Sequence, residues 1–135
     1  MVRDPLPSGT TVRLVLVGCR CPHERLTAHA AAMPQLVEAV RSCGMTPLAQ
    51  LGHDFAGSGH SLCMVLAESH LALHTYPEAS GTVIVEISVC DHLRPNRERA
   101  LDLAERLVAL FRPERYLLEP LELLPRGEWR AGPGA

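Results

Sequence analysis

Several short segments of the chain alternate hydrophobic with polar or β-branched residues, a pattern typical of half-buried β-strands. Strands are predicted over residues 10–17, 45–51, 62–67, 70–75, 82–90 and 116–124. Residues 52–59 are rich in glycine and predict a loop, and Pro120 predicts that the last strand lies at a sheet edge. Only Glu68 and Ser69 interrupt the nearly continuous strand pattern of residues 62–75.

Two longer segments carry hydrophobic residues three and four positions apart, which predicts amphipathic helices. The first runs from about residue 24 to residue 43 and contains Pro34, where the helix is expected to kink or restart. The second, residues 95–111, has the clearest helical periodicity in the chain. The order strand, helix, several strands, helix, strand predicts an α+β fold. We expect a two-layer sandwich, with two helices on one face of an antiparallel sheet.

The length of 135 residues suits a single domain with one hydrophobic core. That domain is predicted to span residues 10–124, between a flexible N-terminus at residues 1–9 and a disordered tail at residues 125–135. No apolar run is long enough to span a membrane, and the polar N-terminus does not resemble a signal peptide, so we expect a cytoplasmic protein. Five cysteines, an odd number, argue against a disulfide framework.

All 13 basic residues are arginine, and the chain contains no lysine. An enzyme that uses pyridoxal phosphate needs a lysine to hold that cofactor, so this chemistry is excluded. The formal net charge of −2, the scattered arginines and the aromatic content of 4% argue against a nucleic-acid-binding surface. If the chain acts on amino acids, its electron sink must therefore be a different group.

Polar and ionisable residues are densest between residues 67 and 78, which read Ala-Glu-Ser-His-Leu-Ala-Leu-His-Thr-Tyr-Pro-Glu. A single histidine on a strand is more often structural than catalytic, and Glu-Ser-His alone is weak evidence for a function. The complete stretch is more specific. It resembles, without a gap, the Glu-Ser-His-x-x-x-His-Thr-aromatic-Pro-Glu signature of the small prokaryotic S-adenosylmethionine decarboxylases.

Positions outside the signature extend this resemblance. The family's serine eight positions before the cleavage serine corresponds to Ser61, and an aromatic residue six positions earlier corresponds to Phe55. Its cysteine at the end of the following strand corresponds to Cys90, after one extra residue in the intervening turn. The resemblance implies a proenzyme that cuts itself between Glu68 and Ser69. Ser69 would then become a pyruvoyl group, the covalent cofactor.

The resemblance also implies a role for each matched residue. The pyruvoyl group from Ser69 forms a Schiff base with the substrate, and Cys90 returns a proton to the product. Ser61 and His74 assist the self-cleavage, by stabilising charge and by removing a proton. An ordinary thiol is mostly protonated at neutral pH and can donate that proton. Three residues are assigned to substrate binding. Phe55 and Tyr76 supply aromatic rings for the adenine, and Glu78 supplies a carboxylate for the ribose.

Ser69 and His74 are five positions apart, so on an unbroken strand they point to opposite faces and do not meet within one protomer. The resemblance implies a homodimer whose active sites cross the subunit interface. One subunit supplies the pyruvoyl group from Ser69 and the thiol of Cys90. Its partner supplies Phe55, Ser61, His74 and Glu78.

The implied reaction converts S-adenosylmethionine to its decarboxylated form, the aminopropyl donor of spermidine (polyamine) biosynthesis, without a membrane or nucleic-acid partner. Two places depart from the family pattern. The segment Val17-Gly18-Cys19 lacks the family's acidic and aromatic residues, and Asp91 adds a negative charge beside Cys90. An arginine or ornithine decarboxylase of the same family is therefore an alternative.

Two alternatives come from other classes of protein. A non-catalytic regulatory subunit would have lost self-cleavage, although all the residues assigned to that reaction are present in this chain. A zinc site at Cys19, Cys21 and His23 would use a Cys-x-Cys spacing that is tighter than zinc sites usually show, so no metal is predicted.

Overall fold

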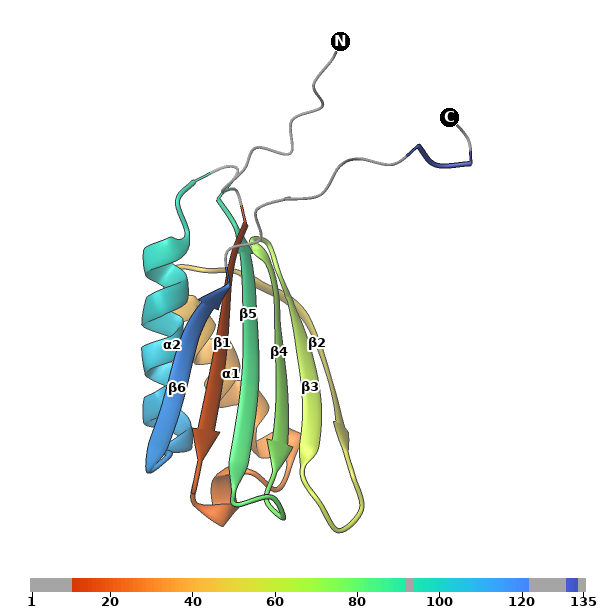
Figure 1. The fold of residues 1–135 in the computed structure, drawn as a ribbon, viewed down its shortest axis with the longest axis vertical. Coiled ribbons are helices and arrows are strands. Elements are labelled where there is room, and N and C mark those ends of the chain that lie inside the picture. Colours follow the sequence, from red (N-terminus) through yellow and green to blue (C-terminus); the bar gives the residue numbers. More distant parts are fainter. Residues whose placement is uncertain (1–10, 92–93, 122–130, 134–135) are drawn as a thin grey trace.

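The computed structural model describes residues 11–91, 94–121 and 131–133. In these ranges the chain forms one sheet with strand order β2-β3-β4-β5-β1-β6, in which all neighbouring strands are antiparallel (Figure 1). The strands are β1 (Thr11–Cys19), β2 (Pro47–Asp54), β3 (His60–Leu66), β4 (Ser69–Tyr76), β5 (Thr82–Cys90) and β6 (Arg115–Leu121). The helices are α1 (His29–Ser42) and α2 (Arg97–Phe111), and a 3-10 turn, His23–Arg25, precedes α1.

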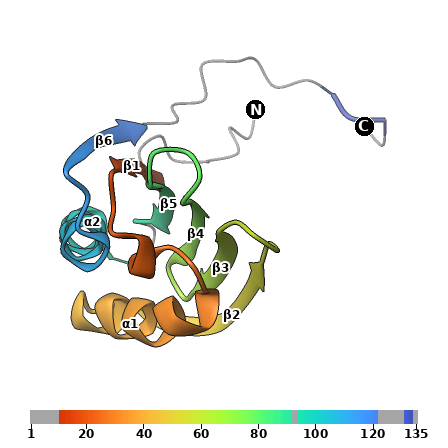
Figure 2. The same ribbon diagram turned by 90° about the horizontal axis from the view of Figure 1, so that it is seen from below.

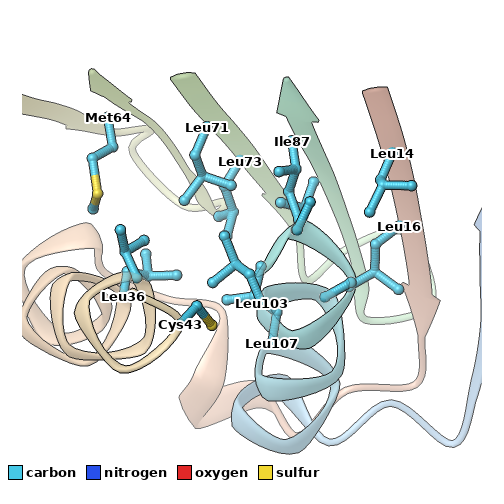
Figure 3. Close-up of a cluster of buried hydrophobic side chains, with 14 of the residues drawn as sticks. Leu14, Leu16, Leu36, Cys43, Met64, Leu71, Leu73, Ile87, Leu103 and Leu107 are labelled. Atoms are coloured by element: carbon cyan, nitrogen blue, oxygen red, sulfur yellow. The ribbon is translucent and has the colours of Figure 1, made fainter. Parts of the chain in front are cut away.

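Both helices pack against the same face of the sheet, which confirms the predicted two-layer α+β sandwich (Figure 2). Alternate residues of the strands point toward the helices, as in β1, where Leu14 and Leu16 are buried. The helices contribute Leu36, Leu103 and Leu107 to the cluster between the layers (Figure 3). Because burying each leucine contributes about 1.5–3 kcal/mol, this cluster fixes the strands that carry the site. The sheet face opposite the helices is called the open face below.

A two-residue turn joins β3 to β4 at the point where the sequence pattern is nearly continuous. Leu66 pairs with Ser69, which leaves Ala67 and Glu68 as the turn. Ser69 has a φ of 142°, in a region that residues with a side chain rarely adopt. Such a conformation costs about 1–3 kcal/mol. The bond between Glu68 and Ser69 therefore lies at the end of a central hairpin, next to a strained residue.

Helix α1 begins at His29, so the predicted start near residue 24 is wrong. Leu26 follows the 3-10 turn and is fully buried, which explains why it fits the helical pattern of hydrophobic residues. Its carbonyl accepts a hydrogen bond from Thr75 Oγ1 over 2.7 Å and is held toward β4. Because the Leu26 carbonyl binds strand β4, it does not accept a helical hydrogen bond, and the helix starts only after it. Pro34 lies inside α1, which runs unbroken past it.

Strand β2 extends to Asp54, so the predicted loop is wrong for residues 52–54. Gly52 is a packing residue, because a Cβ there would overlap the ring of His29. Asp54 Oδ1 accepts a hydrogen bond from the backbone N–H of His29 over 2.9 Å, at the start of α1. This hydrogen bond is also the main reason why the pKa of the Asp54 carboxyl is lowered. Contacts with α1 thus extend the strand beyond the point where the sequence pattern ends.

The predictions for residues 1–9, 122–124 and most of 125–135 lie outside the described residues. Strand β6 forms one edge of the sheet, as the position of Pro120 predicts. None of the described helices has the length and hydrophobicity needed to cross a membrane.

Candidate active site

The carbonyl group of Glu68, which precedes Ser69, is held by the end of the neighbouring strand. The backbone N–H of Cys90 donates a hydrogen bond to this oxygen over 2.7 Å. A donor aimed at a carbonyl stabilises the negative charge that develops when a nucleophile adds to its carbon. The next residue, Ser69, is half-buried and supplies a hydroxyl, whose Oγ lies 3.3 Å from His70 Nδ1. The structure thus brings Glu68, Ser69 and Cys90 together, as the resemblance implies.

The side chain of Glu68 is held as firmly as its carbonyl, by residues that the sequence analysis did not identify. Only 7% of the side chain is exposed. The backbone N–H of Thr46 donates to Oε2 over 3.1 Å, and the guanidinium of Arg94 donates to Oε1 over 3.2 Å. Both partners are more than 20 positions away in the sequence, so no local pattern could have revealed them.

The end of β5, which carries Cys90, is fixed by Asn96, another residue that the sequence analysis missed. The side-chain amide of the buried Asn96 donates a hydrogen bond to the Cys90 carbonyl over 2.7 Å. The carboxylate of Asp91 accepts the backbone N–H of Asn96, also over 2.7 Å. The negative charge beside Cys90 is therefore hydrogen-bonded to the loop that leads into α2.

A second cluster begins with Ser61 on β3 and His74 on β4. These residues are directly opposite each other in the sheet, and Ser61 Oγ lies 2.7 Å from His74 Nδ1. Both are half-buried and lie on the open face, because their neighbours in the strands point toward the helices. The pair predicted to assist self-cleavage is thus preassembled within one chain.

The three predicted substrate-binding residues lie at the same end of the sheet as this pair. Phe55 follows β2 and is half exposed, with its ring edge-on to His53 at a centroid distance of 4.8 Å. Tyr76 is the last residue of β4. Glu78 lies in the next turn, and its Oε2 accepts a hydrogen bond from Ser58 Oγ over 2.8 Å. This end of the sheet therefore carries both aromatic rings and a carboxylate.

The two clusters lie at opposite ends of β4. Ser69 is its first residue and Tyr76 its last, and Ser69 and His74 are five positions apart, about 16 Å along an extended strand. Within one chain, the His74 imidazole therefore does not reach Ser69. The sequence analysis separated the two side chains by the face of the strand to which each points, whereas in the structure their distance along β4 is enough to keep them apart.

Thr75, which is part of the sequence signature, belongs to the core. Its hydroxyl donates to the Leu26 carbonyl and accepts the backbone N–H of His60 over 2.9 Å. His60 is fully buried, and this burial lowers the pKa of its imidazole. The threonine thus ties β3 and β4 to the segment before α1.

The described residues contain no group of three histidine, cysteine or acidic side chains arranged to hold a metal ion. Burial raises the pKa of the Cys21 thiol to about 11, so this thiol stays protonated in the metal-free chain. The zinc alternative at Cys19, Cys21 and His23 thus has no support in this part of the chain.

Comparison with a solved structure first defines the class of fold. The chain superimposes on the crystal structure of the adenosylmethionine decarboxylase from Aquifex aeolicus VF5 with a TM-score of 0.75. The match covers 90% of this chain and 98% of that one, at 17% sequence identity. At this identity the likeness shows the fold alone.

Sequence comparisons then identify the family. The family model for S-adenosylmethionine decarboxylase matches residues 13–122. An S-adenosylmethionine decarboxylase proenzyme from Methanococcus maripaludis (strain C7) is 30% identical over 108 residues, covering 79% of this chain and 82% of that protein. A proenzyme of the same name from Brevibacillus brevis is 32% identical over 87 residues, covering 64% of this chain and 62% of that protein. The chain belongs to the S-adenosylmethionine decarboxylase family, which confirms the resemblance found in the sequence.

Proposed function

We propose that the chain is a self-processing decarboxylase that cuts the bond between Glu68 and Ser69 and then decarboxylates S-adenosylmethionine. The observation that carries the proposal is the geometry of this bond. Its carbonyl oxygen accepts the N–H of Cys90, and the nucleophilic hydroxyl is on a residue with a φ of 142°. The strain disfavours the uncut chain, and the hydrogen bond favours attack on the carbonyl.

Self-cleavage starts when Ser69 Oγ adds to the carbonyl carbon of Glu68. The C–N bond then breaks and leaves an ester between the two residues. Because both groups belong to one chain, proximity lowers the barrier. A general base then removes the α-proton of Ser69, a double bond forms between its Cα and Cβ, and the Cβ–Oγ bond of the ester breaks. Residues 1–68 leave with a terminal carboxylate, and residue 69 becomes a dehydroalanine. This N-terminal residue tautomerises to an imine, which water hydrolyses to a ketone with release of ammonia, so that residues 69–135 begin with the pyruvoyl group. We assign the base to His74, oriented by Ser61.

The residues around the cut bond fit the cofactor that they would form. The pyruvoyl group would supply an electron sink for decarboxylation, the role for which other enzymes use pyridoxal phosphate. Cys90 lies next to it, because its N–H already contacts the carbonyl of Glu68. We therefore assign Cys90 as the proton donor to the product carbon. The loop contacts of Asn96 and Asp91 hold this end of β5 in place.

The cluster at the other end of the sheet is assigned to substrate binding. S-adenosylmethionine presents an adenine ring and a ribose with two hydroxyls. Phe55 and Tyr76 offer exposed aromatic rings for stacking, and Glu78 offers a carboxylate. The names of the relatives point to the same substrate. The product would be the aminopropyl donor for spermidine synthesis.

We further propose that the working unit is a homodimer formed through the open faces of two sheets. Ser69 and His74 lie too far apart within one chain to complete a site. A two-fold axis between the sheets, perpendicular to the strands, would bring the Ser69 end of one sheet to the His74 end of the other. Hydrophobic side chains are exposed on strands β2, β3 and β6 of this face, at Leu51, Val65 and Leu117.

The intact mass of freshly purified protein under denaturing conditions tests the self-cleavage. We expect two fragments, residues 1–68 and residues 69–135, the second without a free amino group at its N-terminus. A chain that stays full length would contradict the proposal and favour a regulatory subunit.

Release of carbon dioxide from S-adenosylmethionine, arginine and ornithine tests the substrate. We expect release from S-adenosylmethionine alone. Release from only arginine or ornithine would overturn the assignment of Phe55, Tyr76 and Glu78 to adenosine binding, while leaving the self-cleavage intact.

A further inference from the structure

Arg94 makes two hydrogen bonds that connect the end of the β3–β4 hairpin to the turn after α1. Its Nη2 donates to Glu68 Oε1 over 3.2 Å and to the carbonyl of Gly44 over 2.6 Å. The other carboxylate oxygen of Glu68 accepts the N–H of Thr46 over 3.1 Å. Ala67 N–H in turn donates to the carbonyl of Thr46. Three segments that are distant in the sequence therefore meet at the residue that precedes the cut bond.

The burial of Glu68 makes this contact important. Its side chain is 7% exposed, whereas that of Arg94 is 44% exposed. A carboxylate this deeply buried is stable only where hydrogen bonds and an opposite charge compensate for the lost hydration. Arg94 is the cation that the structure pairs with it. Without this cation, Thr46 N–H remains as its hydrogen-bond donor, and the side chain gains freedom to turn toward water.

We propose that Arg94 is a positioning residue that sets the rate of self-cleavage. The proposal rests on the proposed function. Arg94 and Thr46 hold the side chain of Glu68, and Cys90 N–H holds its carbonyl, so the plane of the scissile peptide is fixed from both sides. The Ser69 hydroxyl must approach that plane from a defined direction. A displacement of about 1 Å can slow such an intramolecular reaction about 100-fold.

The same geometry assigns Arg94 no part in the later decarboxylation. Its guanidinium contacts the side chain of Glu68 and the carbonyl of Gly44, and both belong to the fragment 1–68. The pyruvoyl group and Cys90 belong to the fragment 69–135. Loss of Arg94 should therefore slow the formation of the cofactor without changing the turnover of chains that already carry it.

The test follows self-cleavage over time in full-length chains made by cell-free synthesis, with Arg94→Ala, Arg94→Lys and the wild type compared by intact mass. We expect Arg94→Ala to cleave about 10- to 100-fold more slowly than the wild type. Arg94→Lys, which keeps the charge, should recover part of the rate. Arg106→Ala removes a surface ion pair with Asp102 on α2 and serves as the matched control, with cleavage as in the wild type. The turnover of S-adenosylmethionine per cleaved chain should be equal in all four proteins.

A double variant distinguishes positioning from a general loss of stability. Glu68→Gln keeps the shape of the side chain but removes the charge that Arg94 compensates. If Arg94 acts through this carboxylate, adding Arg94→Ala to Glu68→Gln should slow cleavage far less than it does in the wild type. Equal slowing in both backgrounds would overturn the proposal, as would wild-type cleavage by Arg94→Ala. A wild-type chain that is never cut would instead contradict the proposed function itself.

Discussion

Ser69 combines a backbone conformation suited to glycine with a side chain that glycine lacks. Its φ of 142° is accessible to glycine without steric cost, whereas any Cβ makes it unfavourable. The hydroxyl at this position can attack the preceding carbonyl, and glycine would offer no such group. The geometry of the hairpin thus keeps a strained residue where the proposed chemistry requires a nucleophile, and the proposed cut before it would release the strain.

Substitutions at Ser69 can separate the strain from the chemistry. Ser69→Ala and Ser69→Gly both lack the hydroxyl, so we expect both to stay full length in a denaturing mass measurement. Only glycine removes the strain, and Ser69→Gly should have a free energy of unfolding about 1 kcal/mol above that of Ser69→Ala in urea titrations. Cleavage of either variant would refute the role of the hydroxyl, and equal stabilities would refute the strain.

The buried imidazole of His60 predicts how stability depends on pH. Burial lowers its pKa below the ordinary value of 6.5, while the neighbouring Asp54 carboxylate and the His29 ring act in opposite directions. The unfolded chain therefore takes up a proton at a higher pH than the folded chain. The free energy of unfolding should fall as the pH decreases below 6.5, by up to about 1.4 kcal/mol per pH unit.

The measurement compares urea unfolding of the wild type and of His60→Asn between pH 7.5 and pH 5. His60→Asn should be less stable at pH 7.5 but should lose less stability on acidification. The exposed His53→Asn is the control and should keep the slope of the wild type. A slope for His60→Asn as steep as that of the wild type would assign the pH dependence to other groups.

At the level of elements, close contacts between strands hold the end of the sheet that we propose binds the substrate. Gly59 lies between β2 and β3, and a Cβ there would overlap the backbone oxygen and hydroxyl of Thr75. The same hydroxyl binds the backbone of Leu26 and His60. The turn that carries Phe55 is thus placed by its packing against β4.

Gly59→Ala should consequently destabilise the fold by about 1–3 kcal/mol, as expected for inserting an atom into a packed region. Gly57 in the same turn is the matched control. Its φ is +71°, but a Cβ there would meet no atom within 4 Å, so Gly57→Ala should cost only about 1 kcal/mol. Thermal and urea unfolding of both variants measure the difference. A smaller loss for Gly59→Ala than for Gly57→Ala would contradict the packing argument.

The sequence predicted every strand and both helices, because burial on one side imposes a period of two on strands and about 3.6 on helices. It misplaced boundaries where contacts between elements decide them. Leu26 is buried like a helical residue but binds Thr75 through its carbonyl, and Gly52 makes room for the ring of His29. Local patterns contain neither contact.

The residues of the candidate site also fall into those that the sequence could identify and those that it could not. The residues of the signature could be assigned because they form one continuous segment with a recognisable spacing. Thr46, Arg94 and Asn96, which hold Glu68 and Cys90, could not be assigned. Each contacts a residue that is separated from it in the sequence and comes close only in the folded chain. Their residue types are common on protein surfaces, so nothing in the sequence distinguishes them.

At the level of the whole molecule, the two proposed half-sites lie at opposite ends of one sheet. The Ser69 end holds the bond that we propose is cut, and the His74 end holds the proposed base and the proposed substrate-binding residues. The fold keeps them apart, because both are on β4 and its register is fixed by β3 and β5. A second chain is therefore the simplest way to complete a site.

Two inactive variants should restore one another if sites form between chains. Ser69→Ala keeps His74, and His74→Ala keeps Ser69. In a mixed dimer, one site then combines an intact Ser69 with an intact His74, and the other site contains neither. Chains with two different affinity tags, expressed together and purified through both tags, should contain a cleaved His74→Ala chain and an uncut Ser69→Ala chain. Each mixed dimer should have one working site where the wild type has two.

The controls for this experiment are the two variants expressed separately, which should stay uncut and inactive. A mixed dimer of Ser69→Ala with wild type should also have one working site and cleave only its wild-type chain, whatever the arrangement of the sites. The decisive comparison is with the pair of complementary variants. If each chain built its own site, the pair of complementary variants would contain no intact site, and neither of its chains would be cut. Cleavage confined to the His74→Ala chain can arise only when the partner's His74 acts on Ser69, because the two residues are about 16 Å apart on a single strand.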